Sequence, residues 1–215
     1  MKNPFLGKNV EVDALREILS QATMFQSDRP RVSIQEMNLF VENSVRSLPK
    51  ATFSPKGEDI RHHVLATAGD YLPSSDRLNP SELELYNKDQ VAGLKALVAA
   101  EAATLRSEER YSSESLHNGN GDAFRHALWN SLMKHEIGQA MAKAWGDAHE
   151  NEADLKNPAI EKEMDLFNNR VGLDIMVQSD TADQCIDRVL SHVRNGNMRR
   201  IVGEGLAPTN RDGEI

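Results

Sequence analysis

Apolar residues recur at every third or fourth position over most of the chain, which is the spacing of helices with one buried face. Capping and breaking residues set the helix ends. Ser33 and Asn79 are suited to cap helix N-termini, and Pro80 is suited to a first helical position. The predicted helices cover residues 10–25, 33–48, 60–68, 80–106, 122–135, 138–149, 158–178 and 181–195.

Strand signals are scarce, because no two alternating segments flank a convincing two-residue turn. The residues after Asn195-Gly196 are polar and glycine-rich, and we expect them to be loosely held. The sequence therefore predicts an all-α fold, a multi-helix globular bundle in which a C-terminal helical domain carries the functional site.

A change of composition marks one internal boundary. Residues 107–121 are rich in Ser, Glu, Asn and Gly, and they end in Asn118-Gly119-Asn120-Gly121. Such a stretch is typical of a connection between structured parts. We therefore expect a helical N-terminal region over residues 1–106 and a helical C-terminal domain over residues 107–215.

Charge and cysteine content exclude several classes of protein. The 215 residues include 25 basic and 33 acidic ones, for a net charge of −8, which disfavours binding of nucleic acid through its phosphates. A single cysteine, Cys185, excludes an internal disulfide, and its apolar neighbours favour a core position over a nucleophile. No apolar run is long enough for a transmembrane segment, and the first residues lack the pattern of a secretory signal. Any export would need another route.

The helix predicted over residues 122–135 carries a polar stripe on an otherwise apolar surface. Apolar side chains occupy more than one of its faces, so we expect this helix to be largely buried. Asp122, His126 and Asn130 stand four positions apart and therefore share one face. These polar groups need partners from elsewhere, since an unpaired buried one costs about 1 to 3 kcal/mol.

Two later segments can supply those partners. One is Asp147-Ala148-His149-Glu150, at the end of a helix with an apolar face. The other runs from Asp165 to Gly172, beside the core stripe predicted at Ile160, Met164, Phe167, Val171 and Ile175. A glycine inside a helix costs about 1 kcal/mol relative to alanine, so Gly172 indicates the close approach of another backbone or of a ligand.

The three segments together offer the groups that general acid–base catalysis or a small metal site requires. A carboxylate beside an imidazole orients it and raises its basicity, and this pairing is open to Asp122 with His126 and to Asp147 or Asp165 with His149. A divalent metal ion such as zinc would find ligands in His126, His149 and Asp165, and its bound water would be the nucleophile.

Without a metal ion the reaction would still be hydrolytic, with Glu150 or Asp165 as general acid and a histidine as general base. The candidate catalytic residues are Asp122, His126, Asp147, His149, Glu150 and Asp165. The candidate substrate-binding residues are His117, Arg125, Asn130, Asn168 and Asn169. Each also has a structural interpretation, as a helix cap or as part of a solvated helix face. No P-loop, dinucleotide fingerprint, H-E-x-x-H or G-x-S-x-G motif offers another template.

Three motifs lie within residues 117–172: Gly119-Asn120-Gly121-Asp122-Ala123-Phe124-Arg125-His126-Ala127-Leu128-Trp129-Asn130, then Asp147-Ala148-His149-Glu150, then Met164-Asp165-Leu166-Phe167-Asn168-Asn169-Arg170-Val171-Gly172. Together they resemble an uncharacterised bacterial domain family found at the C-terminal ends of Rhs-type and wall-associated secreted proteins, where toxin modules sit. The family pattern has His where Phe167 stands, which disfavours a metal site at that position. The resemblance does not assign a catalytic role to any residue.

The resemblance implies an effector that a bacterium delivers into a target cell without a signal peptide. Residues 1–106 would then serve loading onto a secretion-system component, targeting, or contact with a cognate immunity protein. The acidic chain fits nucleic acid poorly, so the sequence favours a hydrolase acting on the bacterial envelope, on peptidoglycan or phospholipid, in the periplasm or at the envelope.

Two alternatives stay open. A metal-dependent nuclease toxin would need basic residues gathered round the site, and the candidates are Arg125, Arg170, Arg188 and Arg194. In a non-enzymatic binding or adaptor protein, the polar stripes would instead form a structural hydrogen-bond network.

Overall fold

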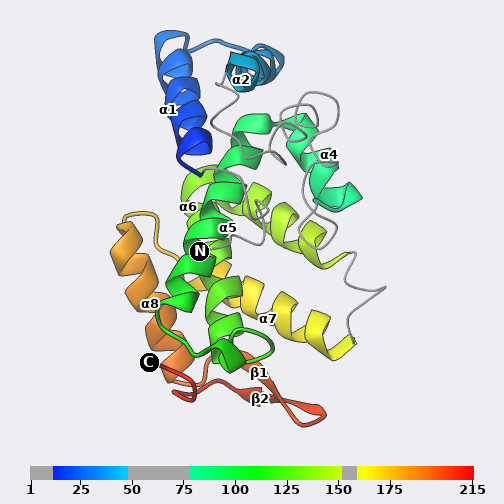
Figure 1. Ribbon diagram of the computed structural model, residues 1–215, viewed down its shortest axis with the longest axis vertical. Coiled ribbons are helices and arrows are strands. Elements are labelled where there is room, and N and C mark those ends of the chain that lie inside the picture. Colours follow the sequence, from blue (N-terminus) through cyan, green and yellow to red (C-terminus); the bar gives the residue numbers. More distant parts are fainter. Residues whose placement is uncertain (1–11, 48–77, 152–158) are drawn as a thin grey trace. The chain divides into compact units, whose positions relative to one another are not determined.

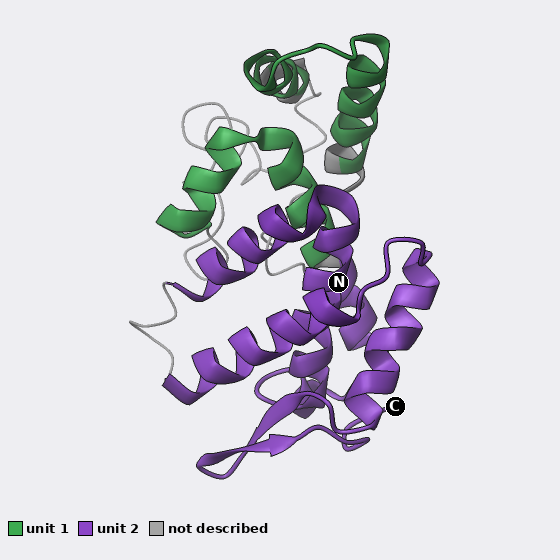
Figure 2. Ribbon diagram, turned by 180° about the vertical axis from the view of Figure 1, so that it is seen from behind, with its two compact units in different colours: residues 1–101 green, residues 102–215 purple. Residues whose placement is uncertain are grey.

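The computed structural model describes residues 12–47, 78–151 and 159–215, and helices make up most of this part of the chain (Figure 1). The strands within it form one two-stranded sheet, so the predicted all-α fold is confirmed. The chain divides into two compact units, residues 1–101 and residues 102–215 (Figure 2). The helix predicted over residues 60–68 lies outside the described residues.

Unit 1 begins with two helices that pack against each other, α1 (Val12–Asp28) and α2 (Ile34–Ser47). Both helices were predicted. Ser33 caps α2 as expected, because its hydroxyl accepts a hydrogen bond from the Glu36 amide while the Glu36 carboxylate accepts one from the Ser33 amide. The buried apolar side chains of these two helices are Ile18, Ala22, Met37 and Val41.

The helix predicted over residues 80–106 is two helices, α4 (Pro80–Lys88) and α5 (Gln90–Glu108). Asn79 caps α4 as predicted, since its side chain accepts a hydrogen bond from the Glu82 amide at 2.8 Å. The prediction of one continuous helix was wrong because Asp89 adopts an extended conformation and caps the next helix. Its Oδ1 accepts a hydrogen bond from the Ala92 amide at 2.9 Å. The division between the two units falls inside α5, a few residues before the boundary expected at residue 106.

Unit 2 is built around the long helix α6 (Asn120–Glu150), with α7 (Ala159–Ile175) and α8 (Ala182–Arg194) packed against it. α6 bends at Gly138, where φ is 79° and ψ is 162°, so the helices predicted over residues 122–135 and 138–149 are its two arms. The second arm and α7 run side by side in both views (Figures 1 and 2). Cys185 is buried on α8, as predicted.

The C-terminal residues form a β-hairpin, and the expectation of a loosely held tail was wrong. β1 (Arg199–Val202) pairs antiparallel with β2 (Gly205–Pro208) across the two-residue turn Gly203-Glu204, and Gly203 has a φ of 62°. β1 packs against α6 and α7, and a bridge between Tyr111 and Glu214 holds the chain beyond β2. The strands are too short for alternation to be recognisable in the sequence, so these tertiary contacts decide the structure.

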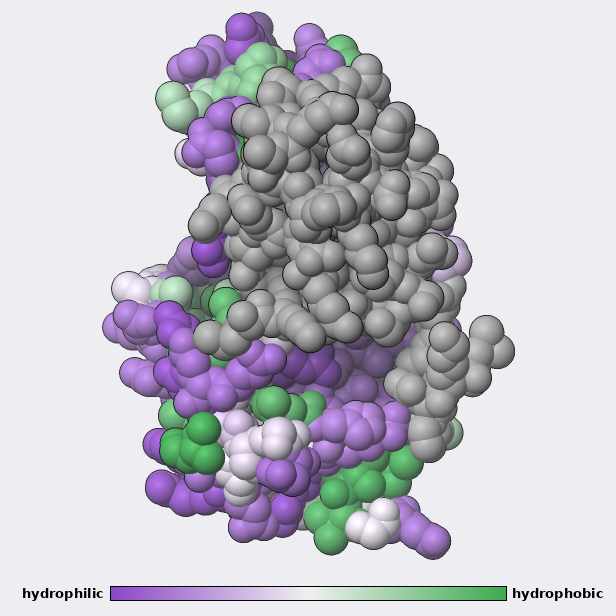
Figure 3. Space-filling view, viewed as in Figure 1, coloured by the Kyte–Doolittle hydropathy of each residue, from purple (hydrophilic) through white to green (hydrophobic). Residues whose placement is uncertain are grey.

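No described helix combines the length and the hydropathy needed to cross a membrane. On the face drawn in Figure 3, hydrophilic residues cover most of the described surface, and apolar residues gather in small separate groups.

Candidate functional site

The buried face of α7 is largely polar, which differs from the predicted core stripe. Its buried residues are Glu161, Met164, Asp165, Asn168, Asn169, Gly172 and Leu173. Of the stripe predicted from apolar spacing, Met164 is buried, whereas the other members are half-exposed: Ile160, Phe167, Val171 and Ile175. The polar side chains turn inward because their partners lie on α6 and β1.

His126 lies at the centre of a buried acidic cluster, and only 3% of its surface is exposed. Its Nε2 lies 3.3 Å from Oδ1 of Asp165 on α7 and 3.6 Å from Oδ1 of Asp122, one turn earlier on α6. Its Nδ1 lies 3.6 Å from Oε1 of Glu150, at the end of the second arm of α6. The fold therefore brings together four of the six candidate catalytic residues, Asp122, His126, Glu150 and Asp165. Together with Arg125 they form what we call the cluster.

Asn169 joins the parts of this cluster. Its Oδ1 lies 3.2 Å from His126 Nδ1 and accepts a hydrogen bond from Asn130 Nδ2 at 2.7 Å. Its Nδ2 donates to Glu150 Oε1 at 3.2 Å. Two of the predicted substrate-binding residues, Asn130 and Asn169, are thus buried and hold the imidazole and a carboxylate in place.

Arg125 fixes the tautomer of His126. The guanidinium Nη2 lies 2.9 Å from His126 Nε2 and donates to Asp122 Oδ1 at 2.6 Å. A guanidinium can only donate hydrogen bonds, so Nε2 must be the unprotonated nitrogen. The proton of the neutral ring then sits on Nδ1 and points to Asn169. The lone pair of Nε2 faces Asp122, Asp165 and the guanidinium.

Burial sets the charge of the two central groups. Burial, and then the positive charge of Arg125, lower the pKa of His126 to about 3, so its ring is neutral at physiological pH. Burial, together with the negative charges of Asp122 and Glu150, raises the pKa of Asp165 to about 9. The Asp165 carboxyl group therefore holds a proton at neutral pH.

The pKa values of the other two carboxyl groups, Asp122 and Glu150, shift in opposite directions. Burial opposes ionisation of Asp122, but the charge of Arg125 and the hydrogen bond from the Asn118 amide outweigh it and lower the Asp122 pKa. Burial raises the pKa of Glu150, which has the Asn169 amide as its hydrogen-bond donor. Asp122 and Arg125 thus form a partly buried ion pair beside two carboxyl groups that are harder to ionise.

The remaining candidates lie outside the cluster. Asp147 is half-exposed and pairs with Lys143 on the outer face of α6. His149 is partly buried beside the cluster, with its ring centre 6.2 Å from that of His126 and 5.1 Å from that of Trp129. The side chain of His117 is 77% exposed and lies 3.7 Å from a Glu161 oxygen.

Asn168 and Phe167 face the hairpin instead of His126. The Asn168 side chain is fully buried, accepting a hydrogen bond from the Arg199 amide and donating one to the Arg199 carbonyl, both at 2.9 Å. The Phe167 ring lies under the Arg199 guanidinium at 4.5 Å. Both residues therefore attach β1 to α7.

Two residues near the cluster were not predicted, Asn118 and Glu161. The Asn118 amide donates to Asp122 Oδ2 at 2.7 Å, and its side chain donates to Glu161 Oε1 at 2.7 Å. Asn118 has a φ of 61°, a conformation that Asn adopts more readily than most residues. The Asn-Gly sequence was the available signal for this turn, whereas nothing local distinguishes Glu161.

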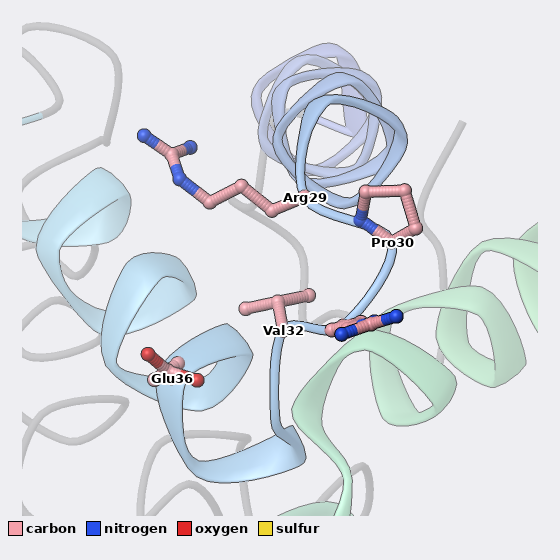
Figure 4. A pocket seen from close by; sticks show the side chains of 5 residues that line it. Arg29, Pro30, Val32 and Glu36 are labelled. Atoms are coloured by element: carbon pink, nitrogen blue, oxygen red, sulfur yellow. The ribbon is translucent and has the colours of Figure 1, made fainter.

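A pocket of about 330 Å³ is lined in part by Asn118, whose amide hydrogen-bonds to Asp122 of the cluster. Its lining residues are Ser112, Glu114, Ser115, His117, Asn118, Gly119, Asn120, Arg200, Ile201, Asp212 and Gly213. A second pocket, in unit 1, lies where α1 gives way to α2 (Figure 4). That pocket is lined by Arg29, Pro30, Arg31, Val32 and Glu36 and offers one carboxylate and no imidazole, so it lacks an acid–base pair.

Three atoms of the cluster are placed to hold a metal ion. One ligand atom from each of Asp122, His126 and Asp165 lies within 4.8 Å of the others, and all three residues are buried. This set differs from the predicted one, in which His149 stood in place of Asp122. The described residues thus offer one imidazole and two carboxylates.

No curated protein and no solved structure matches the chain. A family model described as "Domain of unknown function (DUF6973)" matches residues 83–197, which is more than half of the chain. The matched stretch contains all three sequence motifs and every residue of the cluster around His126. The chain therefore belongs to this domain family of unknown function.

Proposed function

We propose that this protein is a hydrolase in which the cluster around His126 activates a water molecule, and that it acts as an antibacterial effector on the bacterial envelope. The observation that carries the proposal is the 3.3 Å separation between His126 Nε2 and Asp165 Oδ1 inside a pocket of carboxyl groups. A neutral imidazole next to carboxyl groups is suited to bind a metal ion, which would lower the pKa of a bound water molecule and so support attack by water.

The buried position of the cluster requires a route for substrate, and the pocket of about 330 Å³ provides a candidate. Asn118 lines this pocket and donates its amide proton to Asp122, one hydrogen bond away from the cluster. A group bound at Asn118 would therefore be near the acidic side chains. Movement of the Arg125 side chain, which is 22% exposed, would open a second route.

The positions of the arginines favour an envelope substrate over nucleic acid. Of the four arginines that a nuclease would use, Arg125 belongs to the cluster. Arg188 pairs with Asp180, and Arg194 pairs with Glu214. The fourth, Arg170, is exposed on α7 with its guanidinium 5.5 Å from the Phe167 ring. Together with the net charge of −8, these ion pairs disfavour a phosphate-binding surface at the site.

The same burial favours one non-enzymatic alternative. Asp122, His126 and Glu150 are each at most 3% exposed, as expected for a structural network that stabilises the packing of α6 on α7. An adaptor or binding protein would need no more than this. Delivery into a target cell and contact with an immunity protein are part of our proposal, and their support is the resemblance of the three motifs to an uncharacterised domain family found where C-terminal toxin modules sit.

The test is an activity screen with a stability control. The purified chain is incubated with peptidoglycan, phospholipid vesicles and DNA, with and without a chelator, and the products are analysed. We expect cleavage of peptidoglycan or phospholipid, and loss of that activity in His126→Gln with a similar melting temperature. His135→Gln is the matched control, because that side chain is exposed on the same helix, pairs with Glu136 and lies outside both the cluster and the pocket. Inactivity on all substrates, or an unfolded His126→Gln protein, would favour the structural network.

A further inference from the structure

We infer that Asp122, His126 and Asp165 bind one divalent transition-metal ion, zinc or manganese, a site that deepens the proposed hydrolase and rests on it. Their ligand atoms are Asp122 Oδ1, His126 Nε2 and Asp165 Oδ1. The His126 atom lies 3.6 Å from the first carboxylate oxygen and 3.3 Å from the second. One ligand atom from each of the three residues lies within 4.8 Å of the others, so one ion can contact all three residues.

Asp165 supplies the strongest sign of a missing partner. Asp165 is 8% exposed, and its Oδ1 has no hydrogen-bond partner among the described residues. Buried carboxyl oxygens are normally hydrogen-bonded, because an unpaired one loses its hydration without compensation. This oxygen is also the atom that faces His126 Nε2. A metal ion between the two would give Asp165 Oδ1 the partner that it lacks.

The other two ligands are already oriented by groups behind them. The Asn118 amide holds Asp122 Oδ2, which leaves Oδ1 directed at the cluster. Asn169 lies against His126 Nδ1, which leaves the lone pair of Nε2 directed at the two carboxyl groups. Metal-binding histidines typically donate their second ring N–H to such an oxygen, which fixes the ring for the metal.

Arg125 is the competing cation. Its guanidinium contacts Asp122 Oδ1 and His126 Nε2, two of the three ligand atoms. The ion and the guanidinium are therefore alternative partners of the same atoms. The side chain is 22% exposed, so it has a way out towards solvent when the ion binds. Removing this charge should strengthen metal binding.

The ligand types indicate which metal is bound. One imidazole favours zinc over calcium and magnesium, which prefer oxygen ligands alone, and the two carboxylates also suit manganese. Two carboxylates and one imidazole leave room for a water molecule at a zinc ion, as in catalytic zinc sites. The site therefore suits a metal ion that activates water and not a purely structural one.

The experiment measures metal binding without substrate. The full chain is stripped with a chelator and titrated by calorimetry with Zn²⁺, Mn²⁺ and Ca²⁺, and the metal content of the purified protein is measured by mass spectrometry. We expect one Zn²⁺ or Mn²⁺ per chain and weaker binding of Ca²⁺. Asp165→Asn should weaken binding by more than the roughly 10- to 100-fold that loss of a supporting residue costs. Asp147→Asn is the matched control, a half-exposed carboxylate on α6 that lies outside the cluster, and should bind as the wild type does.

Arg125→Met should change the metal affinity in the opposite direction, and it keeps the proposal testable if Asp165→Asn does not fold. It should bind the ion more tightly than the wild type, and the added ion should restore a melting temperature lowered by the loss of the guanidinium. Absence of stoichiometric binding, or equal affinity in wild type and Asp165→Asn, would overturn the site. Binding without hydrolysis would refute the proposed hydrolase alone, whereas chelator-resistant hydrolysis without binding would refute the metal site alone.

Discussion

Gly172 of α7 lies directly against the backbone of Ala127 of α6, so closely that a Cβ atom at position 172 would stand 2.1 Å from the Ala127 carbonyl oxygen. The Ser131 hydroxyl donates to the Gly172 carbonyl at 2.7 Å and strengthens the same contact. This close approach agrees with the interpretation of Gly172 from the sequence. It brings Asp165 and Asn169, one to two turns earlier on α7, within reach of His126.

We therefore expect Gly172→Ala to separate the two helices and to lower the free energy of unfolding by about 3 kcal/mol, the upper range for an overpacked site. Urea denaturation measures the change. Gly205→Ala is the control, since a Cβ there would meet nothing within 4 Å. If both variants were equally stable, the close packing of α6 and α7 would be wrong.

The bend of α6 depends on Gly138. Its φ of 79° and ψ of 162° lie in a region that is nearly restricted to glycine, and a Cβ there would meet nothing within 4 Å. Gly138→Ala should thus cost about 1 to 3 kcal/mol through backbone strain alone. Thermal unfolding monitored by circular dichroism measures this loss. An unchanged melting temperature would indicate that the bend tolerates other conformations.

The cluster predicts a specific dependence of stability on pH in metal-free protein. The pKa of Asp165 is raised to about 9, whereas in the unfolded chain it is near 3.8, so the folded state holds an extra proton between these values. Stability therefore falls as pH rises towards 9. The pKa of His126 is lowered to about 3 from an ordinary value of 6.5. The unfolded chain therefore binds the extra proton at this residue, and stability from His126 falls only as pH drops below 6.5.

Above pH 6.5 the ionisation of Asp165 changes the free energy of unfolding, whereas His126 is neutral in both the folded and the unfolded chain. The free energy of unfolding of the wild type should decrease between pH 7 and pH 9, and that of Asp165→Asn should decrease much less, because an amide does not ionise. Urea titrations at several pH values in the presence of a chelator compare the two proteins. Parallel pH profiles would show that Asp165 is ionised in the folded protein.

Tyr111 predicts a stabilising substitution away from the cluster. Its hydroxyl is buried with no hydrogen-bond partner among the described residues, and burial raises the pKa of the phenol to about 12. Tyr111→Phe removes this unsatisfied group and keeps the ring, which packs against Phe124 at 5.6 Å between ring centres. We expect a gain of about 1 kcal/mol in the free energy of unfolding. A loss of stability would mean that the hydroxyl has a partner.

The candidate site was only partly predictable from the sequence. The four-residue spacing of Asp122, His126 and Asn130 places them on one helix face, and helical geometry alone establishes this. The sequence did not indicate that Asp147 and Glu150 would lie in different environments, because both belong to one short motif. Helix rotation sends Asp147 to the surface beside Lys143 and Glu150 to the interior beside His126.

The sequence by itself determined most of the helices, the caps at Ser33 and Asn79, and the polar stripe of α6, because these features depend on neighbours a few residues away. Tertiary structure decided the inward direction of the polar face of α7, the hairpin, and the choice of Asp165 and Glu150 as partners of His126. Hydrophobic spacing predicts that apolar groups are buried, but a polar face can be buried equally well when another helix supplies its hydrogen bonds. Such pairing joins residues far apart in the chain, and no local pattern encodes it.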